Sequence, residues 1–186
     1  DQPTGVGFSY GAEGDYDHDE AGIRDDMYHF LLEFFAAHPE YAKLPFYVFG
    51  ESYGGHFAPN VAFRVWEGNV NASKTGTSAA LINLQGLAVG NGLTDPAIQY
   101  QYYAKMAFNN TYGVKAVSDV QYNSMVAETP ACINLINQCQ TDTAICPQAQ
   151  SVCNQAQMGP YEEGGLNPFV HSFTVSCIRL PFRAFV

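Results

Sequence analysis

The sequence contains few basic residues and few charges overall. Its 186 residues include 8 Lys plus Arg against 18 Asp plus Glu, for a formal net charge of −10 at pH 7. A chain this acidic repels phosphate backbones and anionic lipid surfaces, so we expect no nucleic-acid partner. It also lacks any run of about 18 apolar residues, so we expect no membrane insertion. With 47% hydrophobic residues, the chain has the apolar content for a folded core.

Closely spaced C-x-x-C pairs are absent too, although the chain has five cysteines. Four of them recur every seven residues, at Cys132, Cys139, Cys146 and Cys153. Seven residues make two helical turns, so a helical hairpin that turns near 141–143 would pair Cys139 with Cys146 and Cys132 with Cys153. Four cysteines allow three pairings, and zinc is the alternative, but zinc sites favour shorter spacings and this stretch has no histidine. We therefore expect two disulfides and no metal, with Cys177 left without an assigned partner.

Two glycosylation sequons are present. They are Asn71-Ala-Ser73 and Asn109-Asn-Thr111, and they predict glycans on Asn71 and Asn109. Together with disulfides, they indicate the secretory route.

Between residues 19 and 89 the pattern predicts a helix, a strand, a second helix and a second strand. The first helix begins after Asp19 and ends near His38, which precedes Pro39. Its apolar face comprises Ile23, Met27, Phe30, Leu31 and Phe34. The later predictions are a strand at Leu44–Phe49, a helix at Tyr53–Trp66, a polar surface loop at 69–78 and a strand at Leu81–Val89. Strand, helix and strand in this order predict a parallel α/β sheet.

The character of the sequence changes beyond Pro96. A tyrosine-rich segment that includes Tyr100 is followed by the cysteine-bearing stretch, and both favour a helical insertion rather than more sheet. We expect the tyrosines to pack rather than to line a pocket. The predicted organisation is residues 1–96 as part of an α/β core, 97–168 as the helical insertion and 169–186 as an atypical tail.

The pattern G-x-S-x-G, which marks a serine on a sharp turn between a strand and a helix, occurs twice. Residues 7–11 place Ser9 within a loop rich in Gly and Pro, whereas residues 50–54 place Ser52 between a predicted strand and a predicted helix. Only Ser52 fits such a turn, called a nucleophile elbow. The alternative is a glycine-rich strand end without chemistry.

A serine hydroxyl needs a histidine base to become reactive. In proteins that use this motif, the acid and the histidine follow the serine in the chain. His56 is four residues into the following helix, so its ring is expected to point away from the hydroxyl. His171 is the other histidine after Ser52. We assign neither histidine as the base, and we assign none of Asp95, Asp119 and Asp142 as the acid. We therefore expect the set of serine, histidine and acid to be incomplete in this chain.

Three blocks resemble signature motifs of the serine carboxypeptidases. They are D-Q-P-T-G-V-G-F-S at 1–9, G-E-S-Y-G-G-H at 50–56 and G-N-G-L-T-D-P at 90–96. The resemblance extends to about Pro168. Residues 99–103 and the evenly spaced cysteines are most similar to the carboxypeptidase Y group of fungal vacuolar enzymes.

The resemblance implies an α/β-hydrolase fold, present in part, with a disulfide-bearing helical insertion. It also implies a cofactor-free hydrolase that removes residues from the C-termini of peptides or proteins at acid pH, in a vacuolar or lysosomal lumen or after secretion. By position, Ser52 matches the nucleophile and the backbone N–H of Tyr53 matches an oxyanion-hole donor. Glu51 matches a glutamate that recognises the substrate carboxylate, and a protonated glutamate can donate a hydrogen bond to that group. The elbow glycines are Gly50, Gly54 and Gly55.

The sequence also departs from the family pattern. A Gly-rich block expected upstream, and an Asp and a His expected downstream, are not found in it. Residues 169–186 contain four Phe, two Arg and no acid, which is typical of an artefact of the gene model. We therefore expect a fragment that is inactive alone. An acyltransferase on the same scaffold and a non-catalytic binding homologue remain alternatives, whereas Glu51 argues against a lipase.

Overall fold

The computed structural model describes residues 1–76 and 81–163. The chain divides into two compact units, Asp1–Thr94 and Asp95–Val186, and each is described here by itself. The boundary predicted from the sequence follows Pro96. The predicted atypical tail at 169–186, with Cys177 and His171, lies outside the described residues.

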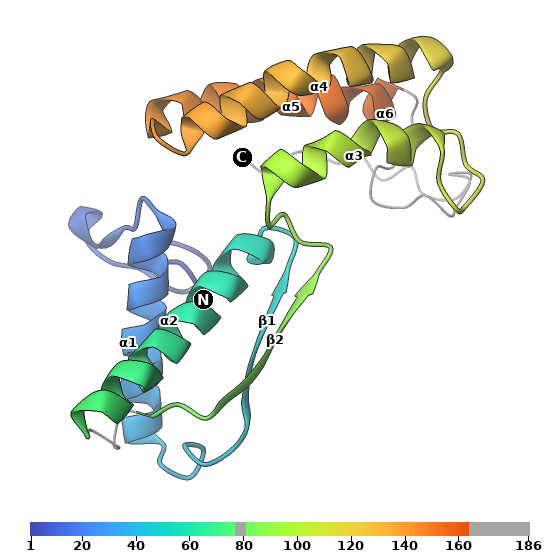
Figure 1. The fold of residues 1–186 in the computed structure, drawn as a ribbon. Helices are drawn as coiled ribbons and strands as arrows, with labels where there is room; N and C mark the ends of the chain where they lie inside the picture. Colours follow the sequence, from blue (N-terminus) through green and yellow to red (C-terminus); the bar gives the residue numbers. More distant parts are fainter. Residues whose placement is uncertain (77–80, 164–186) are drawn as a thin grey trace. The chain divides into compact units, whose positions relative to one another are not determined.

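The first unit is built around two parallel strands joined by a long helix (Figure 1). Its elements are the short 3₁₀ helix η1 (Glu13–Asp15), α1 (Glu20–Ala37), β1 (Phe46–Glu51), α2 (Gly54–Thr75) and β2 (Leu84–Gly90). Helix α2 packs against both strands and α1 packs against α2. The predicted parallel arrangement is therefore confirmed.

The limits of α1 follow from local chemistry. The side chain of Asp19 accepts a hydrogen bond of 2.8 Å from the backbone N–H of Gly22 and so caps the first turn. The helix ends at Ala37, and His38 is its C-terminal cap, directly before Pro39. Both limits agree with the sequence prediction.

The packed face of α1 differs from the prediction at Phe30, which is 58% exposed, and at Tyr28, which is buried instead. Tyr28 lies against Gly68 of α2, where any side chain would collide with its ring. The guanidinium of Arg64 lies 4.1 Å from the centre of the same ring. Tyr28 is buried because Gly68 on the neighbouring helix has no side chain and leaves space for its ring. The sequence of α1 alone does not reveal this.

Helix α2 continues to Thr75. The prediction of a surface loop at 69–78 is therefore wrong for residues 69–75, which are helical. The amide of Asn69 pairs with the backbone of Ile82: its nitrogen donates to the Ile82 carbonyl at 2.8 Å, and its oxygen accepts from the Ile82 N–H at 3.0 Å. The Ser73 hydroxyl donates to the carbonyl one turn earlier. Gly76 ends the helix in the left-handed region, at φ 74°. Polar side chains that suggest a loop are used here to support a helix.

The face of β1 that points away from α2 is open. Tyr47 and Phe49 on that face are 52% and 75% exposed, and Glu51 lies on the same side of the strand. The opposite side of the sheet joins a core of Tyr28, Leu31, Val61, Val65 and Ile82.

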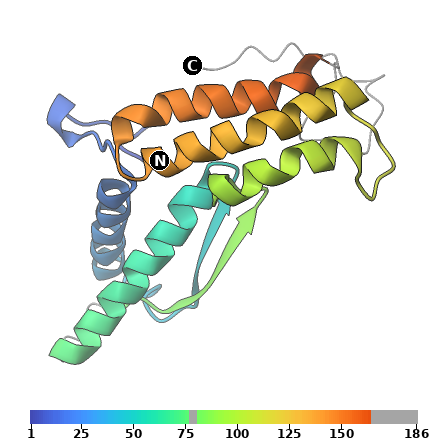
Figure 2. The ribbon, with the colours of Figure 1, turned by 45° about the horizontal axis from the view of Figure 1, so that its top comes forward.

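The second unit is helical, and its three long helices lie side by side (Figure 2). Its elements are α3 (Pro96–Phe108), α4 (Asp119–Cys139), the 3₁₀ helix η3 (Thr143–Ile145), α5 (Cys146–Gln157) and α6 (Gly159–Glu163). Cys132 bonds to Cys153 and Cys139 bonds to Cys146, with Cα atoms 4.9 and 4.8 Å apart. These are the nested pairs that the seven-residue spacing predicts, and they leave no thiolate of this set for zinc.

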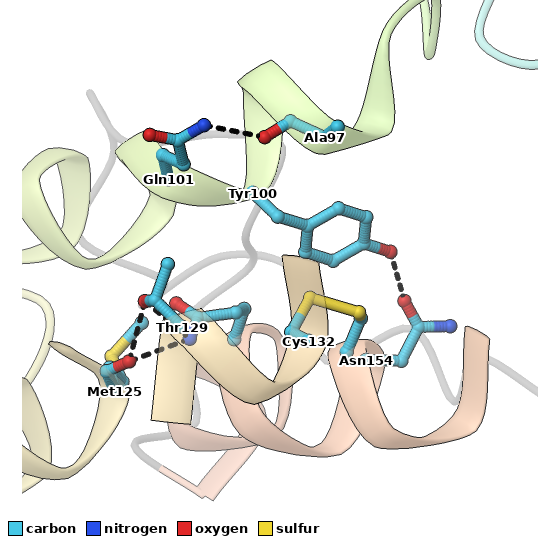
Figure 3. The surroundings of a disulfide bond; sticks show 9 residues. Ala97, Tyr100, Gln101, Met125, Thr129, Cys132 and Asn154 are labelled. Atoms are coloured by element: carbon cyan, nitrogen blue, oxygen red, sulfur yellow. Dashed lines mark hydrogen bonds between the residues drawn. A yellow bond between two sulfur atoms is a disulfide. The ribbon is translucent and has the colours of Figure 1, made fainter. Parts of the chain in front are cut away.

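Buried tyrosines hold the helices of this unit together. The Tyr100 hydroxyl donates to the side-chain oxygen of Asn154 on α5 at 2.5 Å, beside the Cys132–Cys153 disulfide (Figure 3). The Tyr161 hydroxyl donates to the carbonyl of Tyr103 at 2.9 Å. Burial, with a smaller effect of Tyr103, raises the pKa of Tyr161 to about 12. Tyr100 and Tyr103 pack within the unit, as expected, but Tyr102, which was also expected to pack, is 59% exposed.

Candidate active site

Ser52 has a strained backbone at the junction of β1 and α2. Its φ is 57°, a value that residues with a side chain rarely adopt, and its side chain is exposed. Strand β1 ends one residue earlier, at Glu51, and α2 begins two residues later, at Gly54. This strand–turn–helix geometry places Ser52 at the carboxyl end of the parallel sheet, where α/β proteins place reactive groups.

Three backbone hydrogen bonds hold Ser52 in this conformation. Its N–H donates to the carbonyl of Gly90 at 3.1 Å, and its carbonyl accepts from the N–H groups of Gly55 and Leu93, both at 3.0 Å. Gly90 and Leu93 belong to the end of β2 and the following loop. Asn91, between them, is the other non-glycine residue with positive φ in the described part of the chain, at 46°. The loop after β2 therefore fixes the elbow, a role that the sequence did not predict for Leu93.

The glycines around Ser52 differ in what they permit. A side chain on Gly50 would collide with the carbonyl oxygen of Gly54, and one on Gly55 would lie 2.7 Å from the backbone N and O of Leu93. At Gly54 itself, apart from its chain neighbours and the backbone of its own helix, no described atom lies within 4 Å of the position that a Cβ would take. Close approach of the chain thus requires glycine at 50 and 55, and no such contact requires it at 54.

The neighbours of Ser52 present one backbone donor and one acid. Tyr53 occupies the N-cap position of α2 without a capping hydrogen bond from its side chain. Among the described residues no backbone acceptor is found for its N–H, which lies at the positive end of the helix dipole. The Tyr53 hydroxyl donates to Glu20 at 3.3 Å. Burial, and then the Glu20 carboxylate, raise the pKa of Tyr53. Glu51 is exposed at the end of β1.

The second G-x-S-x-G serine lies in a different setting. The Ser9 hydroxyl donates to the backbone carbonyl of Asp1 at 2.7 Å, within a turn that precedes η1. No strand enters this turn, and Ser9 does not have positive φ. Ser52 is the one of the two that has elbow geometry.

No histidine of the described residues is hydrogen-bonded to Ser52. The ring of His56 packs against the Tyr53 ring, with centres 4.8 Å apart. His171 lies outside the described residues. Within residues 1–76 and 81–163, no group of three or more His, Cys, Asp or Glu side chains is arranged to hold a metal ion.

The three aspartates that follow Ser52 have structural roles. Asp95 caps α3 by accepting from the N–H of Ile98, and Asp142 caps η3. Asp119 accepts a hydrogen bond of 2.8 Å from Lys115, and this bond, together with the charge of Lys115, lowers the pKa of that carboxyl. All three belong to the second unit.

The family model for serine carboxypeptidases matches residues 1–177. The chain belongs to the serine carboxypeptidase family. The match passes Pro168, where the sequence resemblance was expected to end, and so includes the first part of the tail and Cys177. The expectation that the resemblance stops at Pro168 is therefore corrected.

Plant and fungal serine carboxypeptidases are similar to this chain. A serine carboxypeptidase-like protein of Oryza sativa subsp. japonica is 45% identical over 83% of this chain and 34% of its own length. Serine carboxypeptidase 3 of Hordeum vulgare is 44% identical over 83% of this chain and 29% of its own. Carboxypeptidase Y of Schizosaccharomyces pombe is 40% identical over 90% of this chain and 17% of its own. The chain thus spans about a third or less of these relatives.

A solved carboxypeptidase structure shares the fold. The prohormone-processing carboxypeptidase Kex1ΔP of Saccharomyces cerevisiae superposes with a TM-score of 0.63 and 26% identity, covering 84% of this chain and 34% of that one. The chain therefore has part of the α/β-hydrolase fold of serine carboxypeptidases, with a disulfide-bearing helical insertion. No helix among the described residues is long and apolar enough to cross a lipid bilayer.

Proposed function

We propose that this chain carries the nucleophile of a serine carboxypeptidase, which releases residues from the C-termini of peptides through an acyl-enzyme on Ser52. The observation that carries the proposal is the backbone of Ser52, a non-glycine residue at φ 57° between β1 and α2. Such strain persists only where surrounding contacts enforce it, and it is found preferentially at reactive sites.

In this reaction the Ser52 oxygen attacks the carbonyl carbon of the last peptide bond. The serine proton passes to a base and then to the departing amine as the C–N bond breaks, and water afterwards cleaves the ester. In this proposal the N–H of Tyr53 stabilises the negative oxygen of the tetrahedral intermediate. Loss of one such donor typically slows turnover by about 10²- to 10³-fold. The general base and its acid lie outside the described residues.

Glu51 supplies a basis for selecting C-termini at acid pH. It precedes Ser52 directly and is exposed at the same end of β1. A protonated carboxyl can donate a hydrogen bond to a substrate carboxylate, whereas an ionised one repels it. Acid conditions therefore favour peptide binding at this position.

A compartment outside the cytosol fits the chemistry of the second unit. Its two disulfides persist in oxidising surroundings such as the secretory pathway. We infer a vacuolar or lysosomal lumen, or secretion, as the location, with peptide or protein C-termini as substrates.

The test is covalent labelling of the complete gene product with a fluorophosphonate, followed by release of C-terminal amino acids from a peptide. We expect the label on Ser52, and loss of both labelling and peptide cleavage in Ser52→Ala. Ser9→Ala is the matched control, because it removes the serine of the other G-x-S-x-G motif and should retain both. An unlabelled Ser52 would identify a non-catalytic homologue. Labelling with acyl transfer from sugar esters, but without peptide cleavage, would identify an acyltransferase.

A further inference from the structure

The two glycosylation sequons have different backbone conformations. Asn71-Ala-Ser73 lies inside α2, which ends at Thr75, whereas Asn109 is the C-terminal cap of α3 and its sequon continues into a turn. Asn71 and Asn109 are both exposed. Exposure alone therefore does not distinguish them, but the backbone does.

Helix α2 separates the two groups that the first sequon must present together. Side chains two residues apart on a helix do not face each other, so the Ser73 hydroxyl is turned away from the Asn71 amide. That hydroxyl donates to the carbonyl of Asn69 at 2.8 Å. Ala72, the middle residue, is only 7% exposed, and the Thr75 hydroxyl donates to the carbonyl of Asn71 at 3.1 Å. This turn is thus packed and hydrogen-bonded as a helix.

The second sequon has the opposite arrangement. Asn109 has left the helical region, at φ −137° and ψ 87°, and the chain enters a turn at Thr111 instead of continuing as a helix. The side chain of Asn110, the middle residue, turns into the loop and donates to the carbonyls of Met106 and Val114 at 2.7 and 2.6 Å. Asn109 and Thr111 on either side of it remain exposed.

We propose that Asn109 is the N-glycosylation site of the folded protein, and that Asn71 accepts a glycan only before the last turns of α2 form. The proposal rests on entry into the secretory route. The donor is an oligosaccharide linked to a lipid diphosphate. The Asn109 amide nitrogen bonds to the anomeric carbon, the bond from that carbon to the diphosphate oxygen breaks, and the amide releases one proton to solvent. The modification thus needs no group from the Ser52 site.

The experiment compares both asparagines in folded and unfolded protein. The complete gene product is made unglycosylated in an oxidising bacterial host, purified, and incubated with oligosaccharyltransferase and lipid-linked oligosaccharide. Initial rates at each asparagine are read by mass spectrometry of peptides. In the folded protein we expect Asn109 to react at least about tenfold faster than Asn71, equivalent to an opening free energy of about 1.4 kcal/mol for α2. After reduction and unfolding in urea, before dilution into the assay, the two rates should become similar.

A matched variant removes the chemical difference between the sequons. Ser73→Thr gives both sequons a threonine, and the folded protein should still favour Asn109. Asn109→Gln and Asn71→Gln verify which site carries each glycan. Equal rates in the folded Ser73→Thr protein, or a preference for Asn109 that survives unfolding of that variant, would overturn the proposal. Because the readout is a glycan mass, its outcome is independent of catalysis by Ser52.

Discussion

The backbone N–H of Leu93 donates a hydrogen bond of 3.0 Å to the carbonyl of Ser52. This bond links the loop after β2 to the nucleophile elbow, so we expect Leu93→Pro, which has no N–H, to release Ser52 from its strained conformation. A displacement of about 1 Å costs on the order of 100-fold in rate, and we expect fluorophosphonate labelling of Ser52 to slow by that amount. Leu93→Ala keeps the N–H and controls for the lost side chain. Labelling of Leu93→Pro at the wild-type rate would show that the bond is dispensable.

Gly55 and Gly54 offer a comparison between neighbouring positions. A methyl group at Gly55 would lie 2.7 Å from backbone atoms of Leu93, whereas one at Gly54 meets no described atom within 4 Å outside its chain neighbours and the backbone of its own helix. We expect Gly55→Ala to lower the free energy of unfolding by about 1–3 kcal/mol. Gly54→Ala should change it by no more than about 1 kcal/mol, and in the stabilising direction. Urea unfolding followed by circular dichroism measures both, and similar losses in the two variants would contradict the close approach at Gly55.

The two disulfides close loops of different length, with sequence separations of 21 and 7 residues. Loop-closure entropy then predicts a loss of about 3 kcal/mol for the Cys132→Ala, Cys153→Ala double variant and about 2 kcal/mol for Cys139→Ala, Cys146→Ala. Cys132 and Cys153 are also fully buried, so their removal leaves a cavity that adds to the first figure. Urea midpoints of the helical unit measure the difference. A larger loss from the shorter loop would be inconsistent with this explanation.

Tyr161 makes the second unit sensitive to alkaline pH. Its pKa is raised to about 12 by burial, so the folded state keeps the phenol proton after the unfolded state, with an ordinary pKa near 10, has lost it. The stability associated with the neutral phenol is complete below pH 10 and is lost as the pH rises to 12. We expect the melting temperature to fall more steeply over that range in the wild type than in Tyr161→Phe. Tyr112→Phe, at an exposed tyrosine, should follow the wild type.

Glu51→Gln tests how substrate C-termini are recognised. If a protonated Glu51 binds the substrate carboxylate, the KM of the complete enzyme should rise by up to about tenfold per pH unit once that carboxyl ionises. The glutamine variant cannot ionise, so its KM should change little with pH. Glu33→Gln, at an exposed position on α1, should keep the wild-type profile. Matching KM profiles for wild type and Glu51→Gln would remove Glu51 from carboxylate recognition.

The features predicted from the sequence depend on local chemistry. Asp19 marks the start of α1 as its N-cap, and Pro39 marks its end by restricting the backbone of the residue before it. The seven-residue cysteine spacing predicts the hairpin because two helical turns return to the same face of a helix. Ser52 was recognisable because its motif follows an apolar strand.

The features that the sequence did not reveal depend on contacts between elements. Burial of Tyr28 depends on Gly68 of the next helix. Leu93 supports Ser52 through a hydrogen bond between backbone groups, which cannot be predicted from the type of side chain at either position. The end of α2 was misplaced because Asn69, a typical loop residue, pairs with the backbone of Ile82.

The pairing of Asn69 with Ile82 also fixes the number of residues between Ser52 and Asn69. Near its start the helix is held to the chain after β2 through Ser52 and Leu93, and near its end it is held to the chain before β2 through Asn69. One inserted residue between these points would rotate the Asn69 amide by about 100° around the helix axis and break the pairing. Tolerance for insertions and deletions in this crossover is therefore confined to positions beyond Asn69.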